Sequence, residues 1–146
     1  LDDRIDVIAT DHAPHTLEEK KQPYLQAPSG GPLVQHAVVA MFEAYHQGKI
    51  SVEKIVEKMA HNPAKIFKIE NRGFIKEGFY ADLVLINPAM PWNVKKENIL
   101  YKCGWSPLEG TNFKSRITHT FVNGELVYQN SKVNDTKAGM RLLFNR

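Results

Sequence analysis

Apolar residues in the first half of the chain follow a helical spacing over two stretches. The first stretch has apolar residues at successive intervals of four, three and four: Val34, Val38, Met41 and Tyr45. This spacing predicts an amphipathic helix that ends at Gly48. A second helix is predicted to begin after the N-cap residue Ser51 and to end near His61, because Pro63 disfavours the helical conformation at the residue before it. One further helical turn is predicted over residues 64–67.

Short apolar runs bounded by turn residues predict strands elsewhere. Residues 5–10 are mostly apolar and rich in β-branched side chains, which indicates a buried strand that leads into a loop. Strands are also predicted over residues 73–75 and 82–86, the second of them buried on both faces. Residues 117–129 predict a β-hairpin, since the Asn-Gly pair at positions 123 and 124 suits a type I′ turn.

Two stretches carry no regular element. Residues 16–32 are polar and contain three prolines and two glycines, so we expect a long loop there, and loops of this length commonly carry function. Residues 93–116 are too mixed for any assignment. The chain also opens on Leu1 rather than Met, and a first strand needs a neighbour to satisfy its backbone. We therefore expect the partner strands to lie upstream, in a longer protein.

Composition narrows the class of protein. The 146 residues are 42% hydrophobic and 24% charged, which is typical of a soluble globular chain and too apolar for a disordered one. No apolar run approaches the length that a membrane-spanning helix needs, which is about 18 residues. The net charge of +3 comes from Lys and Arg scattered along the chain, so neither a nucleic-acid nor a membrane partner is expected. Cys103 alone cannot form an internal disulfide, and no positively charged start leads into an apolar stretch, so nothing in these residues indicates secretion. We expect a cytoplasmic protein.

Residues capable of metal binding and proton transfer gather where the first strand is predicted to end. Asp11, His12 and His15 lie at this point, and active sites of parallel α/β proteins are built from the loops that follow strands. A carboxylate there can bind a metal, shuttle a proton or cap the following turn, and spacing alone leaves these roles open for Asp11. The other histidines show neither His-x-His nor His-x3-His spacing. The chain therefore supplies at most one ligand to a metal site completed elsewhere.

The residues around this cluster carry a resemblance to a known family. Residues 8–15, which read Ile-Ala-Thr-Asp-His-Ala-Pro-His, together with residues 18–20 and 27–30, resemble the last barrel strand and following loop of dihydroorotases, within the cyclic amidohydrolase superfamily. Residues 62–67 and 73–86 resemble the junction between barrel and β-sandwich in that superfamily, although Lys68-Ile69 stands after the first run where the family usually has Gly-Leu. The terminal hairpin is similar to the sandwich strand that commonly closes these chains.

The resemblance implies an α/β plus β fold. Residues 1–70 would form the last strand, substrate loop and helices of a metal-dependent-hydrolase (β/α)8 barrel, and residues 71–146 would form part of a C-terminal β-sandwich. A complete barrel needs about 250 residues, so this chain is too short to hold one together with a sandwich.

The resemblance also implies an activity, the reversible cyclisation of N-carbamoyl-L-aspartate to L-dihydroorotate in pyrimidine biosynthesis. Asp11 matches the family residue that binds zinc and carries the proton, and His15 matches a position that binds the small-molecule substrate. Ser29 and Gly30 match substrate-contacting backbone positions; many relatives carry an aromatic residue at the position of Ser29, so only its backbone contact is carried over. We expect His12 to have a structural or supporting role.

The other ligands of the family's binuclear zinc site, a His-x-His pair, a carboxylated Lys and two further His, would lie before this chain. We therefore expect the chain by itself to be inactive and not to retain zinc, and we expect the protein to form a homo-oligomer. Two alternatives stay open. One is another cyclic amidohydrolase of the dihydropyrimidinase or allantoinase type, against which His15 argues. The other is a catalytically dead dihydroorotase-like assembly domain, against which the intact Asp11 argues.

Overall fold

The segment that leads to the candidate site lies against a helix rather than in a sheet. The computed structural model describes residues 3–145, and residues 4–11 carry no strand. Instead, the Ile8 N–H donates to the Lys58 carbonyl at 3.0 Å, and the Asn62 side-chain amide donates to the Asp6 carbonyl at 2.8 Å. The predicted strand over residues 5–10 is therefore wrong for the described part of the chain. An extended segment becomes a strand only beside a partner strand, and here its partner is a helix.

The first predicted helix is confirmed as α2, Ala37–His46, and Gly48 follows it at a φ of +67°. Its buried face differs from the predicted one. Val39 and Phe42 are buried, whereas Val34 lies before the helix and is 57% exposed. The apolar stripe of the sequence therefore does not mark the face of α2 that packs on the core.

The second predicted helix is longer than expected. It runs without a break through α3 (Val52–Val56), a π-helical turn (Glu57–His61) and α4 (Asn62–Ile66). The Ser51 hydroxyl accepts from the Lys54 N–H at 3.2 Å, which confirms the predicted N-cap. The predicted end near His61 is wrong, because Asn62 keeps helical angles of φ −66° and ψ −44°.

The π-helical turn explains how the helix passes Pro63. The Asn62 N–H bonds to the Glu57 carbonyl, five residues back, instead of the Lys58 carbonyl, four residues back. Pro63 has no N–H to offer the Lys58 carbonyl either. That carbonyl is consequently open to the Ile8 N–H, and the helix irregularity becomes the attachment point for the N-terminal segment.

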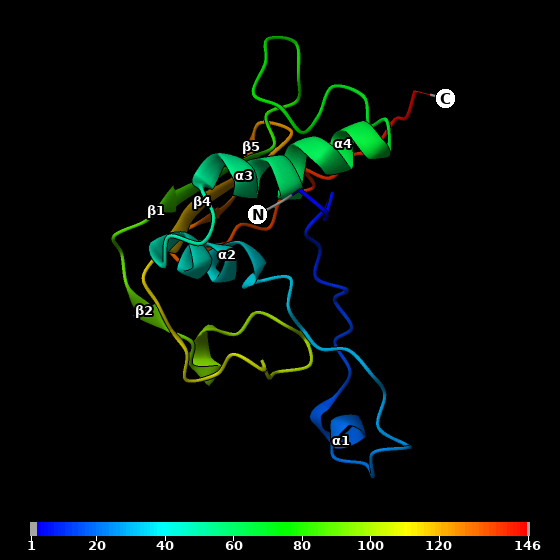
Figure 1. The fold of residues 1–146 in the computed structure, drawn as a ribbon, viewed down its shortest axis with the longest axis vertical. Coiled ribbons are helices and arrows are strands. Elements are labelled where there is room, and N and C mark those ends of the chain that lie inside the picture. The colour runs from blue at the N-terminus through cyan, green and yellow to red at the C-terminus, as the bar shows by residue number, and fades with distance from the viewer. Residues whose placement is uncertain (1–2, 146) are drawn as a thin grey trace.

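The second half of the chain forms a four-stranded antiparallel sheet in the order β1-β4-β5-β6. Figure 1 labels β1, β4 and β5 of this sheet. Its strands are β1 (Leu83–Asn87), β4 (Arg116–Val122), β5 (Glu125–Gln129) and β6 (Lys132–Val133). The predicted hairpin is confirmed, with φ values of +51° at Asn123 and +85° at Gly124. The strand predicted over residues 82–86 is confirmed as β1. Its predicted burial on both faces is wrong, since Val84 and Leu85 are 47% and 44% exposed.

The strand predicted over residues 73–75 does not form, because the chain bends at Gly73 with a φ of +82°.

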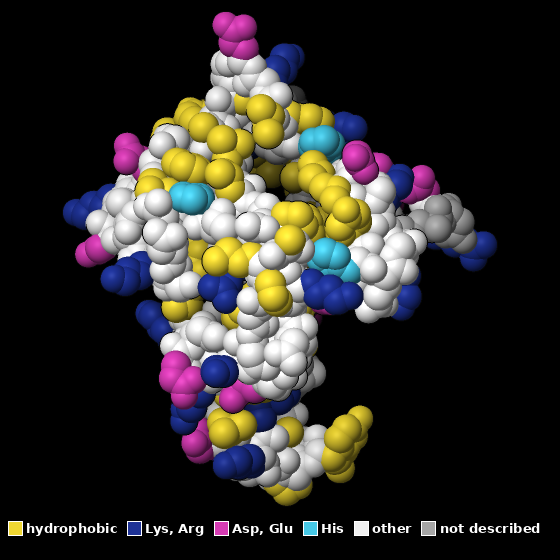
Figure 2. Space-filling model, turned by 90° about the vertical axis from the view of Figure 1, so that its left-hand side faces the viewer, with side chains coloured by type: hydrophobic (Ala, Val, Ile, Leu, Met, Phe, Trp, Pro, Cys, Tyr) yellow, Lys and Arg dark blue, Asp and Glu magenta, His cyan; other side chains and the backbone are white. Residues whose placement is uncertain are grey.

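Hydrophobic side chains are spread over one face of the molecule, as the space-filling view shows (Figure 2). No helix in residues 3–145 is long and apolar enough to cross a membrane.

Residues without a sequence assignment supply much of the core. They form a second, two-stranded sheet of β2 (Trp92–Asn93) and β3 (Asn112–Phe113), with a 3-10 turn at Lys96–Asn98 between them. Val94 and Phe113, each at most 2% exposed, pack with Val39 of α2 in one hydrophobic cluster. This segment also reaches the loop that follows the candidate catalytic residue.

Candidate functional site

Asp11 lies at the end of the extended N-terminal segment and is exposed. Its φ of +44° places it in the left-handed region, which Asp tolerates better than most residues. Within residues 3–145 its carboxylate accepts no hydrogen bond, so it does not cap the following turn. Both oxygens are open to a ligand or a proton, and a carboxylate is one of the groups that bind zinc.

His12 holds the loop together through its ring. Its Nδ1 accepts the Leu33 N–H at 3.1 Å and the Val34 N–H at 3.4 Å. Its ring also packs on Tyr101 with centroids 5.3 Å apart. Nδ1 is thus the acceptor for two backbone N–H groups at once. These contacts join the turn after Asp11 to residues 33 and 34 and to Tyr101.

Gly30 lies where the loop closes on itself. The Ala13 N–H donates to the Gly31 carbonyl at 3.1 Å. Gly30 has a φ of +87°, and a Cβ added there would lie 2.6 Å from the Ala13 Cβ. Lys20 donates to the Pro28 and Gly30 carbonyls at 2.6 and 2.9 Å and so closes the far side of the loop. The loop thus brings Gly30 against the turn that follows Asp11, and Ser29 beside it is exposed.

His15 begins the part of the loop that carries α1, Leu17–Lys20. Its Nδ1 lies 3.8 Å from the Glu19 carboxylate, and its carbonyl accepts the indole N–H of Trp105 at 2.8 Å. Thr16 and Glu19 form a capping box, and the Thr16 backbone N–H holds the pKa of Glu19 below its usual value. Figure 1 shows this loop projecting from the rest of the molecule.

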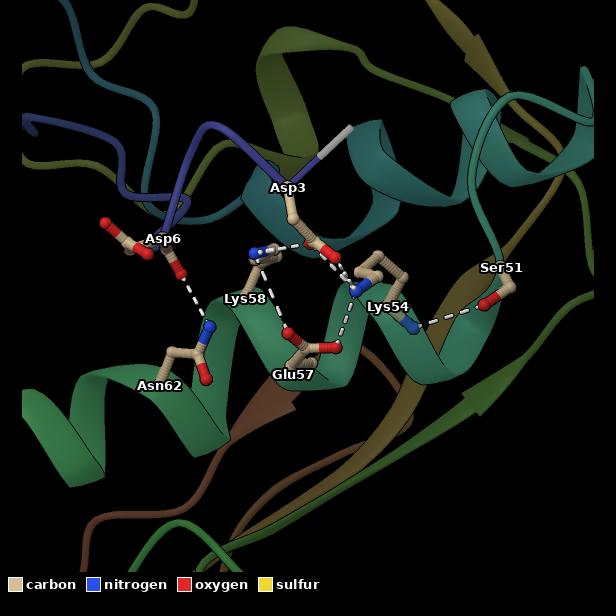
Figure 3. Close-up of polar contacts among 7 residues, drawn as sticks. All are labelled: Asp3, Asp6, Ser51, Lys54, Glu57, Lys58 and Asn62. Carbon is tan, nitrogen blue, oxygen red and sulfur yellow. Dashed lines mark hydrogen bonds and ion pairs between the residues drawn. The ribbon is translucent and has the colours of Figure 1, made fainter. Parts of the chain in front are cut away.

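Charged groups fix the start of the N-terminal segment on the long helix (Figure 3). Asp3 bonds to Lys54 at 2.9 Å and pairs with Lys58 at 3.0 Å, and Glu57 also bonds to Lys54, at 2.8 Å. The two ammonium groups lower the pKa of Asp3 to about 2. With the bonds to Asp6 and Ile8, these contacts determine the path along which the chain reaches Asp11. No local signal in the sequence indicates these contacts.

The described residues do not form a complete metal site. Within residues 3–145 there is no group of three or more His, Cys, Asp or Glu side chains placed to hold a metal ion. Zinc in a catalytic site takes about three protein ligands. Asp11 fits one such ligand because its oxygens are exposed and unpaired among the described residues.

These observations define a class of protein. The sequence profile of the Amidohydrolase family matches residues 1–127, and the chain belongs to this family. Among its curated relatives are dihydroorotases from Pyrococcus furiosus, 38% identical over 97% of this chain, and from Clostridioides difficile, 40% identical over 87% of it. The dihydroorotase of Halobacterium salinarum is 43% identical over 75% of this chain. The chain spans 33%, 30% and 26% of these relatives, respectively, or about a third of their length at most.

Solved structures share the fold. The L-hydantoinase (dihydropyrimidinase) of Arthrobacter aurescens superposes with a TM-score of 0.81 at 26% identity, over 89% of this chain and 30% of that one. A D-hydantoinase (dihydropyrimidinase) from Thermus sp. gives a TM-score of 0.81 at 23% identity, over 92% of this chain and 30% of that one. The described arrangement of helices and strands is therefore one that hydantoinases also adopt.

Proposed function

We propose that this chain forms the C-terminal part of a zinc-dependent dihydroorotase, with the end of a (β/α)8 barrel followed by part of a β-sandwich. The full-length protein would interconvert N-carbamoyl-L-aspartate and L-dihydroorotate in pyrimidine biosynthesis. The observation that carries this proposal is the 38% identity to a dihydroorotase over 97% of the chain, which includes the whole candidate loop. The chain by itself would be inactive, because it offers a single metal ligand.

The reaction needs a nucleophile and a proton carrier. Bound zinc would supply the nucleophile by lowering the pKa of water to roughly 7. Asp11 would be one of its ligands, and its carboxylate would accept the proton of the attacking water. In the hydrolytic direction the same carboxylate would return this proton to the ring nitrogen as the C–N bond breaks, acting first as base and then as acid. The oxygens of Asp11 are exposed and have no partner within residues 3–145, which supports this role.

The loop after Asp11 would bind the substrate. The His15 ring can donate a hydrogen bond to the substrate carboxylate. Backbone groups of Ser29 and Gly30 would contact the substrate from the other side of the loop closure. Gly30 suits this place because a side chain there would collide with Ala13, and the turn after Asp11 would lose its shape.

The second candidate function is hydrolysis of another cyclic amide, as in a hydantoinase or dihydropyrimidinase. The structural superposition with the enzyme from Arthrobacter aurescens favours it. That likeness holds at 26% identity, whereas the dihydroorotases reach 43%. Sequence likeness is thus greater to dihydroorotases, and we place dihydroorotase first.

Turnover by the zinc-loaded full-length protein distinguishes the two functions. The expected result is hydrolysis of L-dihydroorotate in preference to hydantoin and dihydrouracil. A preference for either of the other two amides would overturn the dihydroorotase proposal, and turnover of none of them would favour the assembly domain.

The role of Asp11 has its own test. The substitution Asp11→Asn keeps the shape of the side chain and removes its basicity, so we expect kcat to fall by about 100-fold or more. Asp6→Asn is the matched control, since it makes the same change on the same segment and the contact of Asp6 with Asn62 is made by the backbone. Near-normal turnover in Asp11→Asn would contradict the assignment.

A further inference from the structure

We propose that residues 101–107 form a strap that holds the candidate substrate loop, and that Trp105 is a positioning residue for His15. This inference rests on the proposed function, in which His15 binds the substrate. The strap lies within residues 93–116, for which the sequence predicts no regular element. The residue types and spacing in this stretch do not indicate a contact with the loop.

The strap is anchored at both ends on one buried histidine. His36 is 0% exposed, and its Nδ1 lies 3.2 Å from the Tyr101 hydroxyl and 3.3 Å from the Ser106 hydroxyl. The Tyr101 hydroxyl also accepts the Gln35 N–H at 3.0 Å. Tyr101 and Ser106 are themselves buried. Both ends of the strap are therefore fixed to the start of α2, which belongs to the core.

From this rigid base the strap contacts the loop at several points. Tyr101 packs on the ring of His12, and Pro107 lies beside Gly31. Between them, the Trp105 indole N–H donates to the His15 carbonyl at 2.8 Å, a bond that joins residues 90 positions apart. The His15 N–H donates to the Ala13 carbonyl at 2.9 Å, so both backbone groups of His15 are held.

These contacts matter because, among the residues that the structure describes, the loop projects from the rest of the molecule (Figure 1). The closure made by Lys20 joins the loop only to itself. Without the indole bond, the His15 backbone would sample other positions, and substrate binding would have to select the competent one. Trp105 would thus act on substrate binding through His15, without touching the substrate.

The chain contains a matched control for the indole bond. Trp92, its other tryptophan, also donates its indole N–H to a backbone carbonyl, that of Ser115, at 2.9 Å. The substitutions Trp105→Phe and Trp92→Phe therefore remove the same kind of bond in two places, one on the candidate loop and one in the core. Both would be made in the full-length protein.

The first readout is amide hydrogen exchange of residues 11–31, which requires no activity. Loss of one hydrogen bond is expected to speed exchange in this loop about fivefold in Trp105→Phe and to leave it unchanged in Trp92→Phe. Equal loop exchange in the two variants would overturn the proposal. Should Trp105→Phe fail to fold, Tyr101→Phe loosens the base of the strap while keeping its ring, and the same acceleration is expected.

The second readout is kinetic and uses whichever cyclic amide the wild-type protein hydrolyses. We expect Trp105→Phe to raise KM about fivefold and to change kcat less than twofold, because Asp11 is untouched. A fall in kcat at constant KM would refute the positioning role. If the wild-type protein does not turn over dihydroorotate while Trp105→Phe still loosens the loop, the proposed function fails and the strap stands.

Discussion

Gly73 packs so closely on the long helix that a single added methyl group should destabilise the protein. A Cβ at this position would lie 2.4 Å from the Ala64 Cβ and 3.0 Å from the Ala60 carbonyl oxygen. Carbon atoms in contact are ordinarily about 3.5–4.0 Å apart. Neither neighbour can rotate away, because one is the first side-chain atom of a helical residue and the other is backbone. The substitution Gly73→Ala must therefore move the helix or the bend.

Two costs add in this variant. A non-glycine residue in the left-handed region costs about 1–2 kcal/mol, and overpacking a closely packed site costs about 1–3 kcal/mol. The free energy of unfolding should therefore fall by about 2–5 kcal/mol in Gly73→Ala. Gly78 has the same φ of +82° but no atom within 4 Å of an added Cβ. Gly78→Ala should thus lose only the conformational part, about 1–2 kcal/mol.

Urea unfolding of the two variants and the wild-type protein measures their free energies of unfolding. The difference between Gly73→Ala and Gly78→Ala gives the cost of the steric contact at residue 73. The double variant Ala64→Gly with Gly73→Ala should be more stable than the sum of its single changes, since Ala64→Gly removes the nearer of the two atoms. If Gly73→Ala is no less stable than Gly78→Ala, the close packing described here is wrong.

Two further predictions concern groups that hold the candidate site. Burial lowers the pKa of His36 below its usual 6.5, so the unfolded chain takes up the proton first as the pH falls. The free energy of unfolding should be highest above pH of about 6.5 and decrease below it by at most about 1.4 kcal/mol per pH unit. In urea unfolding, His36→Gln should make the free energy of unfolding less dependent on pH. An unchanged pH dependence in this variant would refute the role of His36. Asn62→Ala should speed amide exchange of residues 5–10 about fivefold by removing the bond to the Asp6 carbonyl. Asn87→Ala removes a side-chain bond from the Ala89 N–H, away from this segment, and should not change that exchange.

The elements that could be predicted from the sequence are those with local signals. The hairpin depends on the Asn-Gly pair at positions 123 and 124, and the start of the second helix depends on the Ser51 hydroxyl. Each of these signals acts within a few residues. The end of that helix could not be predicted the same way, because Pro63 usually stops a helix and here a π-helical turn accommodates it.

Elements defined by distant partners could not be predicted. Val94 and Phe113 are buried by packing with Val39, more than fifty residues earlier, and no periodicity surrounds either of them. Residues 5–10 have the composition of a strand, but their described partner is a helix. Composition indicates that a segment can pair in a sheet; it does not supply the neighbour.

The same distinction between local signals and distant contacts applies to the residues of the candidate site. Asp11, His15, Ser29 and Gly30 could be predicted as site residues because their residue types and order resemble those of a family. Trp105 and Lys58 were missed, since each acts on the loop or on the segment before it through a contact that spans many residues. A sequence pattern can therefore suggest candidates for the chemistry, whereas the residues that contact the loop from a distance carry no such pattern.

Gly73 and the segment that leads to Asp11 both contact the long helix. Ala60, which Gly73 approaches, lies in the π-helical turn, and that turn leaves the Lys58 carbonyl open to the Ile8 N–H. A helix displaced by Gly73→Ala would carry this carbonyl with it, and Ile8 is three residues from Asp11. Amide exchange of residues 5–10 should consequently increase in Gly73→Ala and remain unchanged in Gly78→Ala. Unchanged exchange of residues 5–10 in Gly73→Ala would refute a link between the bend at Gly73 and the position of Asp11.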